Sequence, residues 1–211
     1  AHGMDGIGIR LRAMMGSIAS SRPRVTVLLP VYNGAAYIAE AIESILAQTF
    51  RDFSLVIYED GSTDDTLAII KRYDDPRIEL RALAANRGRA PNLADGVQRT
   101  ESDYIARMDA DDVASSDRFE KQVAFLDRNP SIDLLGTNVV FFSESGEAVG
   151  IQPECHEDIE IALLFGFTML HPTVMMRNSA LKSGGFNYDP ALRDSEDYDL
   201  WVRMVRSRRF H

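Results

Sequence analysis

The 211-residue sequence lacks several features that would point to particular classes of protein. Its single cysteine, Cys155, excludes an internal disulfide bond, and no signature of a nucleophilic thiol surrounds it. No apolar run approaches the roughly 20 residues that a membrane-spanning helix needs. Basic residues are outnumbered, with 23 Lys and Arg against 32 Asp and Glu, so the formal net charge is -9. Such an acidic chain is a poor general binder of nucleic acid, because phosphate contacts need clustered Lys and Arg.

The composition that is present suits one globular domain with a sizeable core, since 45% of the residues are hydrophobic and 26% are charged. We expect residues 1–22 to be an N-terminal extension, with Ala1–Gly3 before Met4 as an expression remnant. They show no clear cleavage site, and we expect them to be poorly ordered or loosely docked. We expect residues 23–211 to form a single domain with a regular half, 23–130, and a more irregular half, 131–211.

Hydrophobic periodicity predicts strands that alternate with helices in the first half. The predicted strands cover Arg24–Val31, Phe53–Tyr58, Ile78–Leu83 and Tyr104–Met108. The predicted helices cover Ala36–Gln48, a segment that starts near Ser62, Pro91–Arg99 and Arg118–Arg128. This order predicts an α/β fold with an open, Rossmann-like, mostly parallel sheet flanked by helices.

The second half has a less regular pattern. Two β-rich runs around a turn-forming SESGE segment predict a hairpin. A helix, a short strand and an amphipathic helix are predicted after it. The expected elements are the strands Leu134–Phe142 and Ala148–Ile151, the helix Glu157–Phe165, the strand His171–Met176 and the helix Ser195–Arg206.

Each of the first four predicted strands ends in unusual polar residues. The four ends are Pro30–Asn33 (PVYN), Glu59–Ser62 (EDGS), Asn86–Asn92 (NRGRAPN) and Asp109–Asp112 (DADD). In open α/β sheets, ligands bind outside the carboxyl ends of the strands. We therefore expect these segments to converge in a single crevice.

The acidic DADD segment needs an explanation, because carboxylates crowded together repel one another unless a cation offsets them. Mg²⁺ and Mn²⁺ prefer oxygen ligands, and Mg²⁺ is commonly held by one or two carboxylates together with substrate phosphates. Asp109 and Asp111 can hold one such metal ion, whose remaining positions take a diphosphate. The alternative to a metal site is that the segment is a solvated surface loop.

Two other chemistries share part of this pattern. A calcium-binding loop could run from Asp109 to Glu120. Against this interpretation, Ala114 stands where the sharp turn of such a loop needs glycine, and a strand rather than a helix precedes the segment. Asp109, Asp111 and Val113 also match the signature of aspartate-nucleophile phosphatases. That signature usually follows the first strand of the core, whereas here it follows the fourth predicted strand.

Six segments in a fixed order resemble the family 2 glycosyltransferases of the GT-A fold. They are PVYN, EDGSTDDT, NRG, MDADD, HPTVMMR and SEDYDLWVR. The resemblance runs from Val25 to Arg206. It implies transfer of a sugar from a nucleotide-diphosphate donor to an acceptor hydroxyl with inversion at the anomeric carbon, and a Mn²⁺ or Mg²⁺ cofactor. It also implies that 23–130 is the nucleotide-binding half and 131–211 the acceptor-side half.

The resemblance assigns roles on the donor side. Tyr32 matches a residue that lies against the base, and Asp60 matches one that hydrogen-bonds the base. A carboxylate at that position suits uracil, which has an N–H to donate, so a UDP-sugar is favoured over thymidine or guanosine donors. Asp111, with Asp109, is the expected metal ligand. The full set of expected nucleotide-binding residues is Pro30, Tyr32, Asn33, Glu59, Asp60, Arg87 and Asp109.

On the acceptor side, Asp197 matches the general base, and Glu196 is a supporting residue. An inverting displacement needs a base beside the acceptor oxygen, opposite the leaving group, and a carboxylate can take that proton. The alternative is that acids simply favour the first turn of a helix. His171 and Trp201 are candidates for the acceptor side, and His171 also for the metal. Structural hydrogen bonding and core packing, respectively, are their alternatives.

The sequence has no QxxRW motif, which processive polysaccharide synthases carry. With no membrane span either, we expect a non-processive enzyme of a bacterial cell-envelope polysaccharide pathway that adds one sugar to a glycan or lipid-linked acceptor. We expect it in the cytoplasm, with the basic C-terminal end able to approach the inner face of the membrane. The runner-up function is a catalytically incomplete nucleotide-sugar-binding module, followed by the phosphohydrolase.

Overall fold

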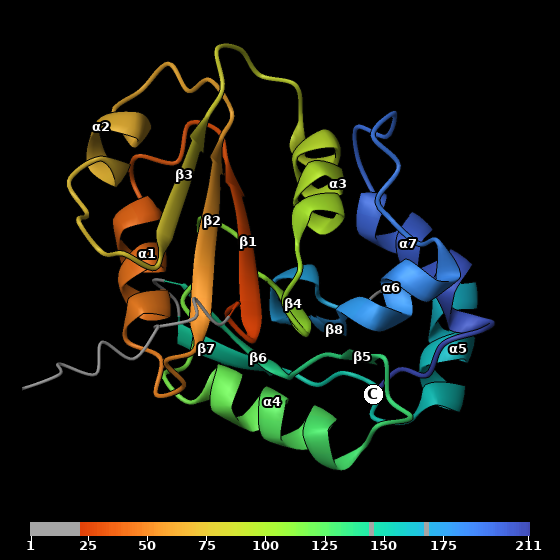
Figure 1. Ribbon diagram of the computed structural model, residues 1–211. Helices are drawn as coiled ribbons and strands as arrows, with labels where there is room; N and C mark the ends of the chain where they lie inside the picture. The colour runs from red at the N-terminus through yellow and green to blue at the C-terminus, as the bar shows by residue number, and fades with distance from the viewer. Residues whose placement is uncertain (1–21, 144–145, 167–168) are drawn as a thin grey trace, which may run out of the picture.

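The computed structural model describes residues 22–143, 146–166 and 169–211 (Figure 1). The expectation about the N-terminal extension falls, apart from Arg22, outside these residues. Within them, six strands form one sheet in the order β3-β2-β1-β4-β8-β5, and β6 and β7 form a separate two-stranded sheet. In the first half, the strands are β1 (Val25–Val31), β2 (Phe53–Glu59), β3 (Ile78–Ala82) and β4 (Tyr104–Arg107).

These four strands are parallel, as predicted. Every residue of β1 is buried, because this strand lies between β2 and β4 and helices cover both of its faces. Val31 at the end of β1 pairs with Glu59 at the end of β2, and Glu59 pairs in turn with Ala82 at the end of β3. The carboxyl ends therefore meet at one edge of the sheet, where the polar segments follow.

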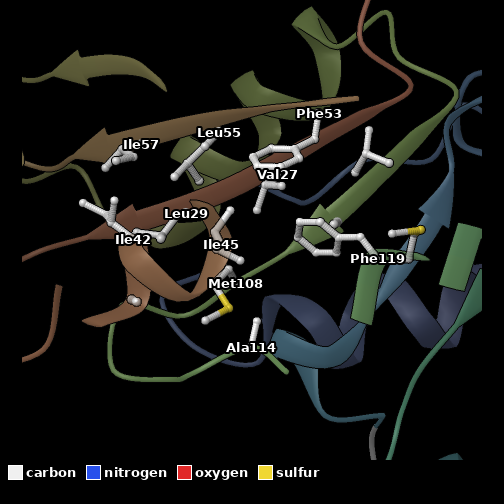
Figure 2. Close-up of a cluster of buried hydrophobic side chains, with 14 of the residues drawn as sticks. Val27, Leu29, Ile42, Ile45, Phe53, Leu55, Ile57, Met108, Ala114 and Phe119 are labelled. Atoms are coloured by element: carbon white, nitrogen blue, oxygen red, sulfur yellow. The ribbon is translucent and has the colours of Figure 1, made fainter. Parts of the chain in front are cut away.

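The helices of the first half are α1 (Ile38–Leu46), α2 (Thr66–Ile70), α3 (Arg89–Arg99) and α4 (Arg118–Arg128). They divide between the two faces of the sheet, because alternate residues of a strand point to opposite sides. Val27 and Leu29 of β1 pack with α1 and α4, as Figure 2 shows, whereas Leu28 packs with α3. A Cβ on Gly96 of α3 would lie 2.8 Å from Leu28, so the glycine lets this helix approach the sheet closely.

The second half adds shorter elements beside β4 (Figure 1). The strand β8 runs antiparallel to both β4 and β5, which makes the sheet mixed at this side. No helix in the described ranges is both long and apolar enough to cross a membrane. The elements are β5 (Leu134–Leu135), β6 (Val139–Ser143), β7 (Gly146–Gly150), α5 (His156–Leu164), the 3-10 helix η1 (His171–Thr173), β8 (Met175–Arg177), α6 (Asn178–Gly184) and α7 (Glu196–Val205).

Three local expectations differ from the structure. The predicted strand Leu134–Phe142 is two strands, and β5 joins the main sheet while β6 pairs with β7. The predicted strand that starts at His171 begins instead with a 3-10 turn, since Pro172 lies at its start and cannot donate a backbone hydrogen bond. The helix predicted to start near Ser62 begins later, at Thr66.

Candidate functional site

A cavity of about 360 Å³ opens at the carboxyl edge of the parallel strands. It is lined by the ends of β1 and β2 and by the loops that follow β3 and β4. The structure thus brings together the four polar segments that the sequence analysis singled out. The expected site residues that line the cavity are Pro30, Tyr32, Asn33, Asp60, Asp109 and Asp111.

The loop after β1 is held in place by the loop after β2. Asn33 adopts a left-handed backbone conformation with a φ of 53° and accepts a 2.8 Å hydrogen bond from the Thr63 amide. The backbone amide of Asn33 donates to the Ser62 hydroxyl oxygen at 3.0 Å. Glu59 is buried and accepts from the Ser62 amide at 2.6 Å, so its carboxylate shapes this loop and does not line the cavity. Tyr32 is left 46% exposed at the cavity wall.

Asp60 ties the end of β2 to the loop after β3. Its Oδ1 accepts from the Arg87 amide at 3.0 Å, and its Oδ2 accepts from the Gly88 amide at 2.9 Å. Each carboxylate oxygen has a second lone pair, so a ligand N–H can still bind here. Arg87 donates from Nε to the Asn92 side-chain oxygen at 2.6 Å, and Arg87 does not line the cavity.

Two buried arginines lie behind the acidic loop after β4, and the sequence analysis missed both. Arg107 donates hydrogen bonds to the Asp109 carboxylate and to a backbone carbonyl. Arg118 donates to the Arg107 carbonyl oxygen at 2.8 Å, and burial, followed by the nearby Arg107 charge, lowers its pKa to about 10. Burial also raises the pKa of Asp112, and the charges of Asp109 and Asp111 add to this shift. The two guanidinium groups offset part of the repulsion among the three carboxylates.

The carboxylates at the cavity fit a divalent cation that also binds a ligand. Asp109 and Asp111 both line the cavity, and oxygen donors of this type suit Mg²⁺ and Mn²⁺. Across the described residues, no cluster of three or more His, Cys, Asp or Glu side chains could hold a metal ion by itself. Two carboxylates together with ligand phosphates match the usual manner of Mg²⁺ binding.

The helix α7 begins with two acids in different environments. Glu196 is fully buried, and Arg89 binds both of its carboxylate oxygens, with Nη2 donating to Oε2 at 3.2 Å and Nε donating to Oε1. Asp197 is only partly buried and accepts a 2.8 Å hydrogen bond from the Tyr198 amide. Burial, with a smaller contribution from the Glu196 charge, raises the pKa of Asp197. Asp197 is therefore the acid of this pair that is available to take a proton.

Neither expected acceptor-side residue lines the cavity. His171 is buried, and its Nε2 shares a 2.8 Å hydrogen bond with the Tyr188 hydroxyl. Burial, with the charges of Arg107 and Arg89, lowers the pKa of His171 well below its usual value, so the ring is neutral at pH 7. Trp201 is fully buried among core residues and offers no exposed ring face to an acceptor. Core packing, the alternative considered for Trp201, is what the structure shows.

The cavity wall contains residues that the sequence analysis did not select, namely Tyr37, Arg89 and Asn92. Gly88 has a φ of 99° and turns the chain into α3, so that Arg89 and not Arg87 reaches the cavity. The signal for this was Gly88, three positions before the predicted helix Pro91–Arg99, since glycine readily adopts such a φ and can start the helix earlier.

Comparisons with known proteins point to one family. The model of the family described as glycosyl transferase family 2 matches residues 26–184. A putative glycosyltransferase of Bacillus subtilis, EpsE, is 38% identical over 190 residues, which cover 88% of this chain and 68% of that protein. The O-antigen biosynthesis glycosyltransferase WbnJ of Escherichia coli is 32% identical over 191 residues, which cover 86% of this chain and 71% of WbnJ.

Solved structures share the fold. Residues 1–349 of S. aureus TarS in complex with UDP-GlcNAc match with a TM-score of 0.74 and 22% identity, over 89% of this chain and 56% of that one. The mannosyltransferase PcManGT from Pyrobaculum calidifontis, in complex with GDP-Man and Mn²⁺, matches with a TM-score of 0.68 and 19% identity, over 90% of this chain and 55% of that one.

The chain spans about two thirds of the length of the two curated relatives and little more than half of the two solved chains. The family match covers most of the chain, and it includes the strand-end segments that line the cavity. The mostly parallel sheet agrees with the expected GT-A fold. The chain belongs to glycosyl transferase family 2, so the enzyme class expected from its ordered motifs is confirmed.

Proposed function

We propose that this chain transfers a sugar, with inversion, from a nucleotide-diphosphate donor to a hydroxyl group of an acceptor. The observation that carries the proposal is the position of Arg89. Its guanidinium lines the cavity that also contains Asp60, Asp109 and Asp111, and it lies within electrostatic range of both Asp109 and Asp197. Asp197 does not line this cavity itself, but Arg89 connects it to the donor-side carboxylates, which supports transfer between two substrates at this site.

The donor is proposed to be a nucleotide-diphosphate sugar with a UDP-sugar favoured. In this proposal, the base lies between Pro30, Tyr32 and the Asp60 carboxylate, which keeps lone pairs free for a base N–H. TarS is described in complex with UDP-GlcNAc and PcManGT in complex with GDP-Man, so both uridine and guanosine donors occur among proteins of this fold.

Asp109 and Asp111 would hold the divalent metal ion. When bound, Mn²⁺ or Mg²⁺ neutralises charge that develops on the departing diphosphate. The Asp109 carboxylate is already oriented before a metal ion binds, because it accepts a hydrogen bond from buried Arg107. The PcManGT complex with Mn²⁺ supports a divalent ion, and we propose Mn²⁺ or Mg²⁺ as alternatives.

We propose Asp197 as the general base. Its carboxylate accepts the acceptor hydroxyl proton while that oxygen forms a bond to the anomeric carbon, and the bond from this carbon to the diphosphate oxygen breaks on the opposite face. A pKa raised by burial makes Asp197 a better proton acceptor than a solvated aspartate. Glu196 supports the general base only indirectly, because both of its carboxylate oxygens accept hydrogen bonds from Arg89 and are not available to take a proton.

Residues 23–211 act as one unit in this proposal, with 23–130 for the donor and 131–211 for the acceptor. WbnJ is named for O-antigen biosynthesis, which supports a glycan or lipid-linked acceptor in a cell-envelope pathway. Non-processive addition of one sugar is part of the same proposal. Peripheral association with the inner face of a membrane is part of the same proposal, because Arg206, Arg208 and Arg209 give the last residues a basic character.

A second candidate is a module that binds nucleotide sugars without transferring them. Its support is that the chain spans only part of the length of its relatives, so acceptor-binding residues of those proteins can lie beyond the matched region. The phosphohydrolase alternative is not supported, because the matching family model and the named relatives are glycosyltransferases.

The test is release of nucleoside diphosphate from a panel of UDP-, GDP- and dTDP-sugars, with a broad panel of glycan and lipid-linked acceptors. Runs with Mn²⁺, with Mg²⁺ and with chelator are compared. Acceptor-dependent release from one donor that stops with chelator is the expected result. Donor binding without release from any pair would favour the binding module, and phosphate release from simple phosphomonoesters would contradict the proposal.

A further inference from the structure

The N-terminus of α3 opens onto the cavity with its first side chain, Arg89. The Gly88 amide is held by Asp60, and its positive φ turns the chain so that the helix begins at Arg89. Among the described residues that line the cavity, Arg89 is the sole lysine or arginine. The first turn of an 11-residue helix carries a partial positive charge that favours anions.

An independent observation lies one turn into the same helix. Asn92 is fully buried and lines the cavity. Its side-chain oxygen accepts from Arg87 Nε at 2.6 Å, but its side-chain nitrogen has no hydrogen-bond partner among the residues that the structure describes. A buried N–H group without a partner costs about 1–3 kcal/mol, and such groups are rare in folded proteins. The Asn92 amide therefore lacks an acceptor atom, which an oxygen of a bound ligand can supply.

The Arg89 guanidinium is fixed in place and still has donor capacity. Nε and Nη2 bind the two oxygens of buried Glu196, whereas no hydrogen bond is found for Nη1 within the described ranges. The Arg89 side chain is 45% exposed, while Glu196 is fully buried. A guanidinium that is oriented by a buried carboxylate has lost its rotational freedom before a ligand arrives, so little further entropy is lost on binding.

We propose that Arg89, the Asn92 amide and the first turn of α3 form a subsite for the diphosphate of the donor. This inference rests on the proposed function. The subsite faces the same cavity as Asp109 and Asp111, so the diphosphate lies between the acidic loop and the helix start. Glu196, the residue before Asp197, orients Arg89, and this ion pair connects donor binding to the helix that carries the general base.

The competing explanation is that Arg89 only neutralises buried Glu196. The single change Arg89→Gln cannot separate the two, because it leaves a buried carboxylate without its cation. The double variant Arg89→Gln/Glu196→Gln can, since it removes both charges of the ion pair together and leaves no buried carboxylate without its cation. A counter-ion role predicts that the double variant regains both stability and ligand binding, whereas the proposed subsite predicts that it regains stability alone.

The experiment is calorimetric titration of the wild-type chain and the double variant, in Mn²⁺, with UDP, GDP and dTDP and with uridine, guanosine and thymidine. For the diphosphate that binds the wild type, the double variant should bind about tenfold to a hundredfold more weakly, which corresponds to the loss of charge-assisted hydrogen bonds. Affinity for the matching nucleoside should stay within about twofold, because the nucleoside has no phosphate. Arg99→Gln, an exposed site on the same helix, is the matched control and should change neither affinity.

Equal diphosphate affinity in the wild type and the folded double variant would overturn the subsite and leave the proposed function intact. If none of UDP, GDP and dTDP bound the wild type, the proposed function would fail and the subsite with it. Should the double variant unfold, Asn92→Asp provides the second measurement. This isosteric change replaces the unpartnered donor with an acceptor and a negative charge, so diphosphate affinity should fall at least tenfold, and an unchanged affinity would overturn the proposal.

Discussion

Replacement of Asp197 by asparagine removes the proposed general base while it preserves the shape of the side chain. The asparagine oxygen can still accept the 2.8 Å hydrogen bond that Asp197 accepts from the Tyr198 amide. Glu196 cannot substitute as a base, because it is fully buried and both of its oxygens are bound by Arg89. The change therefore isolates proton transfer from the structure of the site.

The expected effect is a loss of about 10²–10⁴ in kcat, the usual contribution of a positioned general base. This loss equals about 3–5 kcal/mol of transition-state stabilisation. Donor affinity should stay within about twofold of the wild type, because Asp197 makes no contact with the donor in this account.

Although Asp197→Asn should lower the transfer rate, it should not lower the stability of the folded chain. Burial raises the pKa of Asp197 in the folded chain above its unfolded value. Ionisation of this group thus lowers the free energy of unfolding as pH rises through the folded-state pKa. At pH 7 the neutral asparagine avoids this cost, so the melting temperature of Asp197→Asn should equal or exceed that of the wild type.

The assay is single-turnover and steady-state transfer across pH, with thermal unfolding measured on the same preparations. In the wild type, the rate should fall on the acid side as Asp197 becomes protonated, with the midpoint above the ordinary carboxyl value of 3.8. This fall of the rate at acid pH should be absent from Asp197→Asn. The matched control is Asp199→Asn, which removes an acid from the same helix that pairs with Arg203. Transfer by Asp197→Asn at the wild-type rate, or an equal loss in Asp199→Asn, would refute the assignment.

Three further predictions concern other parts of the account. Asp111→Ala should abolish the Mn²⁺-dependent part of the calorimetric affinity for a nucleoside diphosphate, and unchanged Mn²⁺ dependence would reject it as a ligand. Trp201→Ala should lower the free energy of unfolding in urea by about 3–5 kcal/mol, since the ring is fully buried; a selective rise in acceptor KM at unchanged stability would contradict core packing. Gly61→Ala should cost at least about 1–2 kcal/mol in the same measurement, because Gly61 has a φ of 73° and a Cβ would lie 2.8 Å from Ala85 backbone atoms. An unchanged unfolding midpoint would contradict that strain.

The sequence predicted the parallel half of the fold well because local and tertiary signals agree there. The β1 run is apolar throughout and buried throughout, and the predicted helix Arg118–Arg128 has the bounds of α4. The segment Leu134–Phe142 was harder, because hydrophobic content alone does not reveal where a strand leaves one sheet and enters another. The helix α6 was not predicted at all, since it is short and packs largely through Ala180 and Leu181.

The candidate site shows the same division. The rule that ligands bind at the carboxyl ends of parallel strands brought Asp60, Asp109 and Asp111 to one cavity without any knowledge of the structure. The sequence did not reveal which side chains those carboxylates meet. Arg107 and Arg118 lie in an apolar strand and at a helix start, and their partnership with the acidic loop depends on packing between elements far apart in the chain.

The central claim is that the cavity binds a nucleoside diphosphate with the help of a divalent metal ion. The most direct test is a thermal-shift titration with UDP, GDP, dTDP and ADP, each with and without Mn²⁺, because ligands that bind the native state raise its stability. The account predicts that one diphosphate, with UDP favoured, raises the melting temperature substantially more in Mn²⁺ than without it. No shift with any of the four, or shifts that do not depend on Mn²⁺, would contradict it.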